Sequence, residues 1–142
     1  MSIDMPDTER RAFLSAGTRT GKLAVTRLDG SPHVAPIWFV LDGDDLVFTT
    51  GEGTIKGKSL LRDGRVALCV DDDDPPYSFV VIEGRASIST DVEVMLGWAT
   101  KLGARYMGEA RAEEFGRRNA VPGELLVRVT PTRIVAKTGI SD

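Results

Sequence analysis

Hydrophobic positions along the first two thirds of the chain fall in short runs that are typical of β-strands. The dipeptides Asp29-Gly30 and Asp42-Gly43 separate the first of these runs, and Asp-Gly is a preferred sequence for tight hairpin turns. We therefore predict a meander of strands near residues 22–28, 33–41 and 45–50. Two further strands are expected near residues 65–71 and 78–89, connected by the sequence DDDDPPY.

Helical patterns interrupt these strands at two places. The segment MPDTERRAFLSAG starts with Pro6 and acidic residues, continues with apolar residues and ends at Gly17, which is the pattern of a short amphipathic helix. A second short helix is expected near residues 54–63, between two of the strands.

The C-terminal third changes to a helical period. From Val92 to about residue 107, hydrophobic residues recur every three or four positions, and Thr90 with Glu93 fits a capping box. The charged stretch EARAEEFGRR continues as helix, and the tail GELLVRVTPTRIVAKTG returns to a strand, interrupted near Pro131. About six strands in hairpins, with helices inserted late, predict a mainly β, α+β fold: a small antiparallel barrel with flanking helices.

Composition narrows the class of protein. A chain of 142 residues is long enough for one domain and too short for two, so we expect a single domain over residues 1–142. The net charge of −3 gives no reason to expect nucleic acid or an anionic membrane as partner. A secretory signal and an apolar stretch of membrane-spanning length are not found, and Cys69 is the only cysteine. These features predict a cytoplasmic protein.

The helix expected near residues 54–63 begins with an unfavourable sequence. Lys56 and Lys58 place positive charge where helix N–H groups already carry partial positive charge, and Gly57 lowers helix propensity. One interpretation is that the lysines are ordinary solvated surface charges. The other is that they bind an anion, with Gly57 allowing close approach. Nearby hydroxyl groups suited to phosphate oxygens come from Thr49, Thr50 and Thr54. The spacing fits neither a P-loop nor a dinucleotide-binding glycine motif.

Other conspicuous residues favour structural roles. His33 is the only histidine, so histidine-ligated zinc and a Ser-His-Asp triad are not expected, and we predict no metal site. The acidic run Asp71–Asp74 is interpreted as a solvated turn, and Cys69 as a buried core thiol. Trp98 is expected to pack or to contact a second subunit, whereas Trp38 is a candidate neighbour of a cofactor ring.

Three segments in this order carry a family resemblance: DGSPHVAPIWF, VFTTGEGTIKGKSLLRDGRV and VDDDDPPYSFVVIEGRA. Together they resemble the split β-barrel flavin and deazaflavin oxidoreductases, which are relatives of pyridoxamine 5′-phosphate oxidase. The chain is most similar to the branch that uses the deazaflavin coenzyme F420. The resemblance covers roughly residues 10 to 90 well and the C-terminal third loosely. It implies a six-stranded, FMN-binding-like split barrel and a homodimer with cofactor clefts at the subunit interface.

The resemblance also implies roles for individual residues. Lys56 corresponds to the lysine that holds the cofactor phosphate, and Lys58 to a basic position of the deazaflavin branch. Ser59 and Gly57 depart from the family pattern at the same helix. The remaining matched positions border the ring or its tail: Ile37, Trp38, Phe39, Tyr77 and Ser78.

The leading hypothesis is an F420-dependent oxidoreductase that transfers a hydride from the reduced deazaflavin to a small conjugated organic substrate. One alternative is an FMN-dependent oxidase or reductase, because both cofactors carry a phosphate on a ribityl chain. The other is a non-catalytic carrier of F420. Basic residues such as Lys58, Arg62 or Arg19 are candidates to meet the carboxylates of the F420 tail. No catalytic side chain is assigned, and the proton donor is left open.

Overall fold

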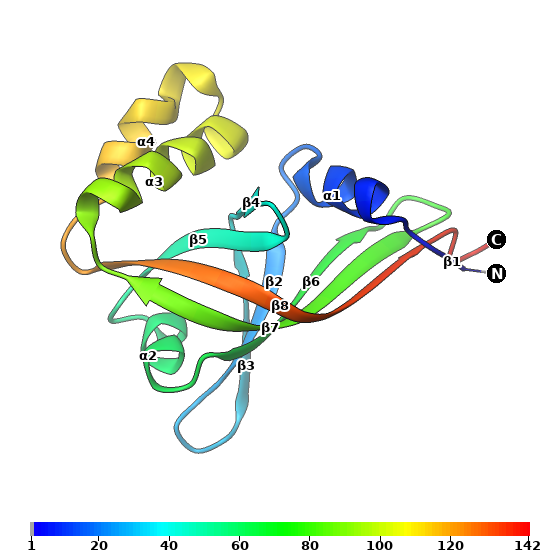
Figure 1. Ribbon diagram of the computed structural model, residues 1–142, viewed down its shortest axis with the longest axis horizontal. Coiled ribbons are helices and arrows are strands. Elements are labelled where there is room, and N and C mark those ends of the chain that lie inside the picture. Colours follow the sequence, from blue (N-terminus) through cyan, green and yellow to red (C-terminus); the bar gives the residue numbers. More distant parts are fainter. Residues whose placement is uncertain (1) are drawn as a thin grey trace.

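Strands from the whole length of the chain form one curved antiparallel sheet in the computed structural model, which describes residues 2–142 (Figure 1). The strands are β1 (Ile3–Asp4), β2 (Gly21–Thr26), β3 (Pro32–Ile37), β4 (Val40–Asp42), β5 (Asp45–Gly51), β6 (Arg65–Asp72), β7 (Ser78–Ser89) and β8 (Glu124–Thr138). The helices are α1 (Asp7–Ser15), α2 (Ile55–Arg62), α3 (Val92–Met107), a 3₁₀ turn (Glu109–Arg111) and α4 (Ala112–Asn119).

The strands are hydrogen-bonded in the order β3-β2-β6-β7-β8-β5-β4, and β1 pairs with the C-terminal end of β8. Between residues 2 and 142 no ladder joins the two outer strands, β3 and β4, so the sheet curves without closing. Helix α2 lies at one end of the sheet. Helices α3 and α4 form a hairpin that projects from the sheet (Figure 1). This architecture confirms the predicted antiparallel α+β fold with flanking helices.

The strand expected over residues 33–41 is wrong in its bounds. It divides into β3 and β4, which pair with different neighbours, β2 and β5, at opposite edges of the sheet. The predicted meander of three successive strands is therefore also wrong. The chain leaves the ladder at Trp38 and Phe39 because side chains of α3 take over the backbone hydrogen bonds of Phe39. The hydroxyl of Tyr106 accepts from the Phe39 N–H at 3.1 Å, and Arg105 Nη1 donates to the Phe39 carbonyl at 2.6 Å.

Two further strand predictions need correction. The two-residue β1 was not expected, so the sheet has eight strands over the described residues rather than about six. The tail is not interrupted at Pro131, because β8 runs from Glu124 to Thr138 as one strand. A register shift opposite Glu83 and Gly84 leaves Thr132 as an extra residue beside Pro131, and such a bulge accommodates a residue without an N–H.

The helices follow the predicted ranges closely, but the capping box at α3 is wrong. Asp91, not Thr90, is the N-cap of α3, and its carboxylate accepts from the N–H groups of Glu93 and Val94 at 3.0 and 3.3 Å. Helices α3 and α4 pack closely at Gly116, where an added Cβ would lie 2.2 Å from Thr100 Oγ1.

Hydrophobic side chains cover both faces of the sheet near β5 and β8. The barrel interior holds the larger cluster, which includes Leu23, Phe39, Phe48, Leu68, Ile82 and Val127. On the opposite face, Val47 and Leu126 contact Met95 and Ala99 of α3. The start of α3 is therefore fixed to the sheet, and this contact determines where the rest of the hairpin lies.

Candidate functional site

The segment Trp38–Phe39 forms one wall of the candidate site, and α3 holds it in place. The rings of Trp38 and Tyr106 stack with centroids 4.9 Å apart and planes within 4°. Phe115 of α4 approaches the same indole at 6.1 Å. The Tyr106 hydroxyl also donates to the Arg19 carbonyl at 2.7 Å, and burial raises the pKa of this phenol. One face of Trp38 is thus occupied by the protein, and the side chain remains 37% exposed.

Arg105 joins α1 to the same wall. Its guanidinium donates to the carbonyls of Leu14 and Gly17 at 2.7 and 3.0 Å, in addition to its bond to Phe39. A cation at the end of α1 also interacts favourably with the helix dipole. Arg105 therefore links α1, α3 and the Trp38–Phe39 segment in one contact.

The start of α2 forms the opposite wall. Thr54 is the N-cap, and its Oγ1 accepts from the Gly57 N–H at 3.0 Å. The Lys58 N–H donates to the Thr54 carbonyl, whereas the N–H groups of Ile55 and Lys56 find no acceptor within residues 2–142. Two donors and the Lys56 ammonium are therefore available together at this helix end.

Gly57 has a packing role that the sequence did not indicate. An added Cβ would lie 2.1 Å from the Gly51 carbonyl oxygen and 3.0 Å from the Glu52 Cα. Residue 57 is buried against the end of β5, so the missing side chain permits contact between α2 and the sheet. Its position does not require a ligand at this residue.

A cavity of about 290 Å³ lies between these walls. Its lining comes from β3 and the residue after it, the end of β5, the start of β8, and helices α2, α3 and α4: Pro36, Ile37, Trp38, Thr49, Thr50, Gly51, Lys56, Leu102, Asn119 and Glu124. Gly51 pairs with Glu124 in the β5–β8 ladder, which explains how the start of β8 reaches the same place. Lys56 makes no ion pair with any group in residues 2–142.

The structure brings together half of the predicted site residues, namely Ile37, Trp38, Thr49, Thr50 and Lys56. Phe39 is fully buried in the barrel interior, and Thr54 is used as the helix cap. Lys58 is exposed and does not line the cavity, because residues two apart on a helix point about 200° away from each other.

Tyr77 and Ser78 lie elsewhere in this chain, where β7 begins. Tyr77 is 42% exposed with a positive φ of 64°, and the Ser78 hydroxyl bonds to that of Thr138 at 2.9 Å.

Both arginines that were candidates to meet the F420 tail have partners within the protein. Arg19 pairs with Asp72 at 3.3 Å, and Arg62 donates to the Thr26 carbonyl.

Besides Pro36 and Gly51, which adjoin predicted positions, sequence reasoning missed three residues of the cavity, Leu102, Asn119 and Glu124. They come from the C-terminal third, which the family resemblance covers only loosely. Leu102 belongs to the predicted apolar face of α3, so its orientation toward the sheet could be predicted from the sequence. Asn119 and Glu124 carry no sequence signal, because polar residues at the end of a helix and the start of a strand are common.

Cys69 differs from its predicted role. Val66, Leu68 and Val70 point into the barrel, and the period of two places Cys69 on the outer face, where it is half-buried. The expectation of a core thiol is therefore wrong. Burial and the nearby Asp71 raise the pKa of this thiol.

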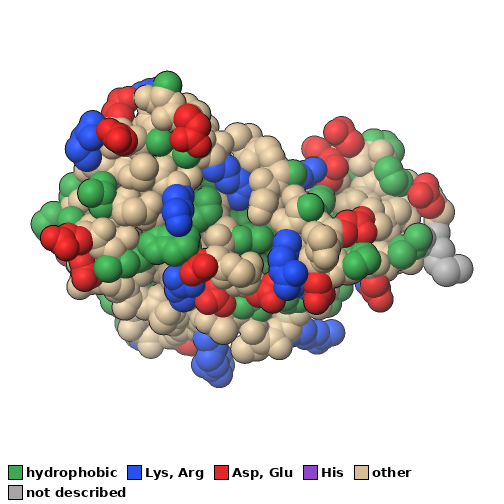
Figure 2. Space-filling model, turned by 45° about the horizontal axis from the view of Figure 1, so that its top comes forward, with side chains coloured by type: hydrophobic (Ala, Val, Ile, Leu, Met, Phe, Trp, Pro, Cys, Tyr) green, Lys and Arg blue, Asp and Glu red, His purple; other side chains and the backbone are tan. Residues whose placement is uncertain are grey.

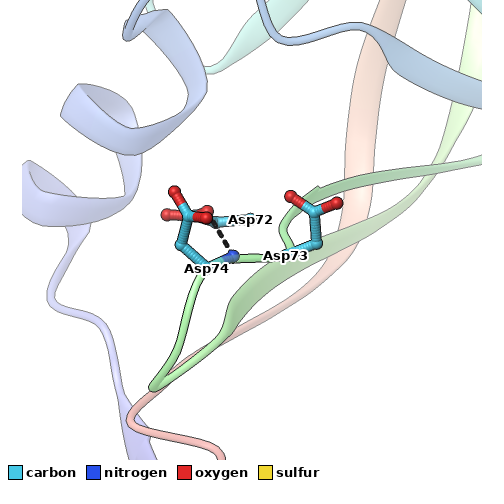
Figure 3. A group of neighbouring side chains, drawn as sticks. All are labelled: Asp72, Asp73 and Asp74. Carbon is cyan, nitrogen blue, oxygen red and sulfur yellow. Dashed lines mark hydrogen bonds between the residues drawn. The ribbon is translucent and has the colours of Figure 1, made fainter.

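The acidic run is a solvated turn only in its second half, because Asp71 and Asp72 end β6 whereas Asp73 and Asp74 lie exposed in the turn before β7 (Figure 3). Asp72 accepts from the Asp74 N–H at 3.0 Å and also pairs with Arg19. The carboxylates of Asp72, Asp73 and Asp74 lie within 4.8 Å of one another. Exposed acidic groups of this kind are common without an ion, and we assign no function to the cluster.

A larger hollow of about 610 Å³ lies on the outer face of the sheet, over β2, β6 and β7. Its floor includes the small residues Ala24 and Ala67, and Arg65 at its rim is paired with Asp63 at 2.8 Å.

On the face drawn in Figure 2, basic and acidic side chains are intermixed, and neither sign forms a continuous surface. None of the helices within residues 2–142 has the length and apolar character needed to cross a membrane.

Comparison with known proteins agrees with the fold. A family model described as pyridoxamine 5′-phosphate oxidase matches residues 6–137. The chain belongs to the pyridoxamine 5′-phosphate oxidase family. Its sheet and helices are those of the split-barrel fold of this family, as the resemblance predicted. Among curated proteins, none matches the chain.

Solved structures add detail to the family assignment. A conserved hypothetical protein of Mycobacterium tuberculosis is 26% identical, with a TM-score of 0.85 over 98% of this chain and 88% of that one. An F420 reductase is 28% identical, with a TM-score of 0.68 over 87% of this chain and 94% of that one. An FAD-binding protein of Mesorhizobium loti, 19% identical, shares the fold with a TM-score of 0.69 over 96% of both chains. This member of the family is therefore similar to flavin-related oxidoreductases.

Proposed function

We propose that this protein is an F420-dependent reductase that acts on a small conjugated organic substrate. The observation that carries the proposal is the cavity that Lys56 and Trp38 line together, where Lys56 also belongs to a helix start with two N–H groups that have no acceptor in residues 2–142. A phosphate group matches the first feature and a planar ring matches the second. The 28% identity to an F420 reductase favours the deazaflavin over FMN.

The residues present fit a phosphorylated cofactor. Lys56 and the N–H groups of Ile55 and Lys56 would hold the phosphate, because they offer a charge and two aligned donors at a helix N-terminus. Thr49 and Thr50 line the same cavity, and the Thr50 hydroxyl lies 3.3 Å from that of Thr54. The deazaflavin, when bound, supplies hydride transfer, and the protein supplies position and electrostatics.

The second wall would orient the ring and exclude water. Pro36, Ile37 and Trp38 form an apolar surface, and the stack with Tyr106 keeps the indole of Trp38 in one orientation. Fixing the reacting groups in this way removes several kcal/mol of a barrier, on the order of 7 to 11 in well-oriented model reactions. A strongly basic or acidic catalytic side chain is not needed for this contribution.

The proposed enzyme acts as a homodimer. The outer sheet face carries apolar residues without cover in one chain: Val34 is 63% exposed and neighbours Ala24, which in turn neighbours Ala67. Burial of this face against a second copy would remove the apolar surface from water. It would also give Tyr77 and Ser78, which are remote from the cavity of their own chain, a route to a site at the interface.

Cofactor titration and turnover test the proposal. The protein is titrated with F420 and with FMN while tryptophan fluorescence is followed, and we expect tighter binding of F420. Reduced F420 is then mixed with a panel of enones and quinones, and we expect its oxidation by at least one acceptor. Preference for FMN would instead assign the flavin oxidoreductase alternative. Binding of F420 without oxidation by any acceptor would assign the carrier alternative.

A further inference from the structure

Glu124 is the acidic residue that lines the Lys56 cavity, and backbone hydrogen bonds fix its position. It begins β8 opposite Gly51, its N–H donates to the Val121 carbonyl at 3.1 Å, and the neighbouring Gly123 carbonyl accepts from Glu52 at 2.9 Å. A Cβ on Gly51 would lie 3.7 Å from Glu124 Oε2. The carboxylate therefore lies next to the end of β5, in the same cavity as Lys56.

The Glu124 carboxylate is unusual because nothing in the described chain compensates it. It is half-buried, yet it makes no ion pair or side-chain hydrogen bond within residues 2–142. Lys56 lines the same cavity without being paired to it. Burial raises the pKa of this carboxyl, as expected for a charge that has lost water without gaining a partner. A half-buried acceptor of this kind is satisfied by a ligand that carries hydrogen-bond donors.

The two charges of the cavity define complementary requirements. Lys56 attracts an anionic group, whereas Glu124 repels a second anion and accepts from hydroxyl or N–H groups. The side chain of Asn119, which also lines the cavity and has no hydrogen-bond partner in residues 2–142, adds a neutral donor and acceptor. A chain that carries hydroxyls along its length and a phosphate at one end meets both requirements, and inorganic phosphate meets only one.

We propose that Glu124 is a specificity-determining residue of the Lys56 cavity, whose carboxylate accepts hydrogen bonds from the hydroxyls of a phosphorylated polyol and disfavours a bare inorganic anion. This inference rests on the proposed function, because it takes the phosphate to lie at Lys56. It adds a residue outside the segments that carry the family resemblance.

The test uses ligands that separate the two effects. One is inorganic phosphate. The other is the phosphate-free ribityl compound, riboflavin or its 5-deaza counterpart, whichever chromophore the wild type prefers. For Glu124→Gln we expect phosphate to bind more tightly and the ribityl compound more weakly, each by roughly five- to tenfold. A purely structural role would move both affinities in the same direction.

Two further variants complete the design. Glu124→Asp keeps the charge but withdraws it, so we expect weaker ribityl binding with unchanged phosphate binding, and this variant serves if Glu124→Gln does not fold. Glu52→Gln is the matched control, because Glu52 is exposed and lies outside the cavity; it should alter neither affinity. If Glu124→Gln and Glu124→Asp leave ribityl binding unchanged, or Glu124→Gln shifts both ligands alike, the inference is overturned. If Lys56→Ala leaves phosphate binding unchanged, the proposed function itself fails.

Discussion

The indole of Trp38 stacks on the phenol of Tyr106, with centroids 4.9 Å apart and planes within 4°. The same phenol oxygen accepts from the N–H of Phe39, the next residue along the chain, at 3.1 Å and donates its own proton to the Arg19 carbonyl at 2.7 Å. One side chain of α3 therefore determines the ring orientation at residue 38 and the backbone path at residue 39. The candidate cofactor wall therefore depends on a distant helix, because Tyr106 follows Phe39 by 67 positions along the chain.

This dependence makes Tyr106→Phe an informative variant. The substitution keeps the stack but removes the hydroxyl, which leaves the buried Phe39 N–H without its partner. We expect the free energy of unfolding to fall by about 1–3 kcal/mol, measured by urea denaturation. Tyr77→Phe is the control, because the Tyr77 hydroxyl is exposed and makes no hydrogen bond in residues 2–142. Equal stability of Tyr106→Phe and wild type would contradict the assigned role.

Lys56 and Lys58 are expected to differ in their importance for cofactor binding. Lys56→Ala removes a charge-assisted contact to the phosphate, so affinity for F420 or FMN should fall by about ten- to a hundredfold. Lys58→Ala should have a much smaller effect, because Lys58 lies on the exposed side of α2. Fluorescence titration measures both. A larger loss from Lys58→Ala than from Lys56→Ala would place the anion on the other side of the helix.

Two helical glycines should respond to alanine with opposite signs. Gly57→Ala brings a Cβ within 2.1 Å of the Gly51 carbonyl oxygen, so we expect lower stability despite the gain in helix propensity. Gly97→Ala in α3 meets no atom within 4 Å, so only the propensity gain of about 1 kcal/mol is expected. Thermal denaturation of both variants measures the difference. Stabilisation by Gly57→Ala would show that α2 does not pack on β5 in this way.

Acid stability should depend on Asp44, which joins α1 to the turn before β5. Arg11 and Arg10 donate to its carboxylate at 2.8 Å and lower its pKa. A carboxyl with a lowered pKa stabilises the folded state above its unfolded pKa of about 3.9, and this contribution is lost as the pH falls through the folded value. We expect Asp44→Asn to lower the melting temperature at pH 6 and to reduce its further fall toward pH 2. Asp73→Asn, at an exposed residue without an ion pair, should follow the wild-type profile.

The homodimer can be tested at the exposed Val34. Val34→Lys places a charge in the uncovered outer face, so sedimentation should show a shift from dimer toward monomer. Leu28→Lys is the matched control, since Leu28 is 83% exposed in the turn between β2 and β3 and does not belong to that face. A wild-type protein that sediments as a monomer would remove the proposed interface, and with it the route of Tyr77 to a shared site.

Much of the fold was predictable because its signals are local. The Asp-Gly turns, the period-two strands and the amphipathic face of α3 each depend on a few neighbouring residues. The division of the strand at Trp38 was not predictable in the same way, because the hydrogen bonds that replace the ladder come from Arg105 and Tyr106. The capping box failed for a smaller reason, since Thr90 and Asp91 are both good N-caps and adjacent.

The amino-acid sequence by itself determined the β2–β3 and β4–β5 hairpins, the position of α2 and the presence of Lys56 at its start, since turn residues and hydrophobic periods act within a few positions. Only the tertiary structure decided that Lys56 faces the cavity while Lys58 faces solvent, and that Gly57 serves packing. It also brought Asn119 and Glu124 into the site, because the β5–β8 ladder and the α3–α4 hairpin join segments whose contact no local sequence pattern predicts.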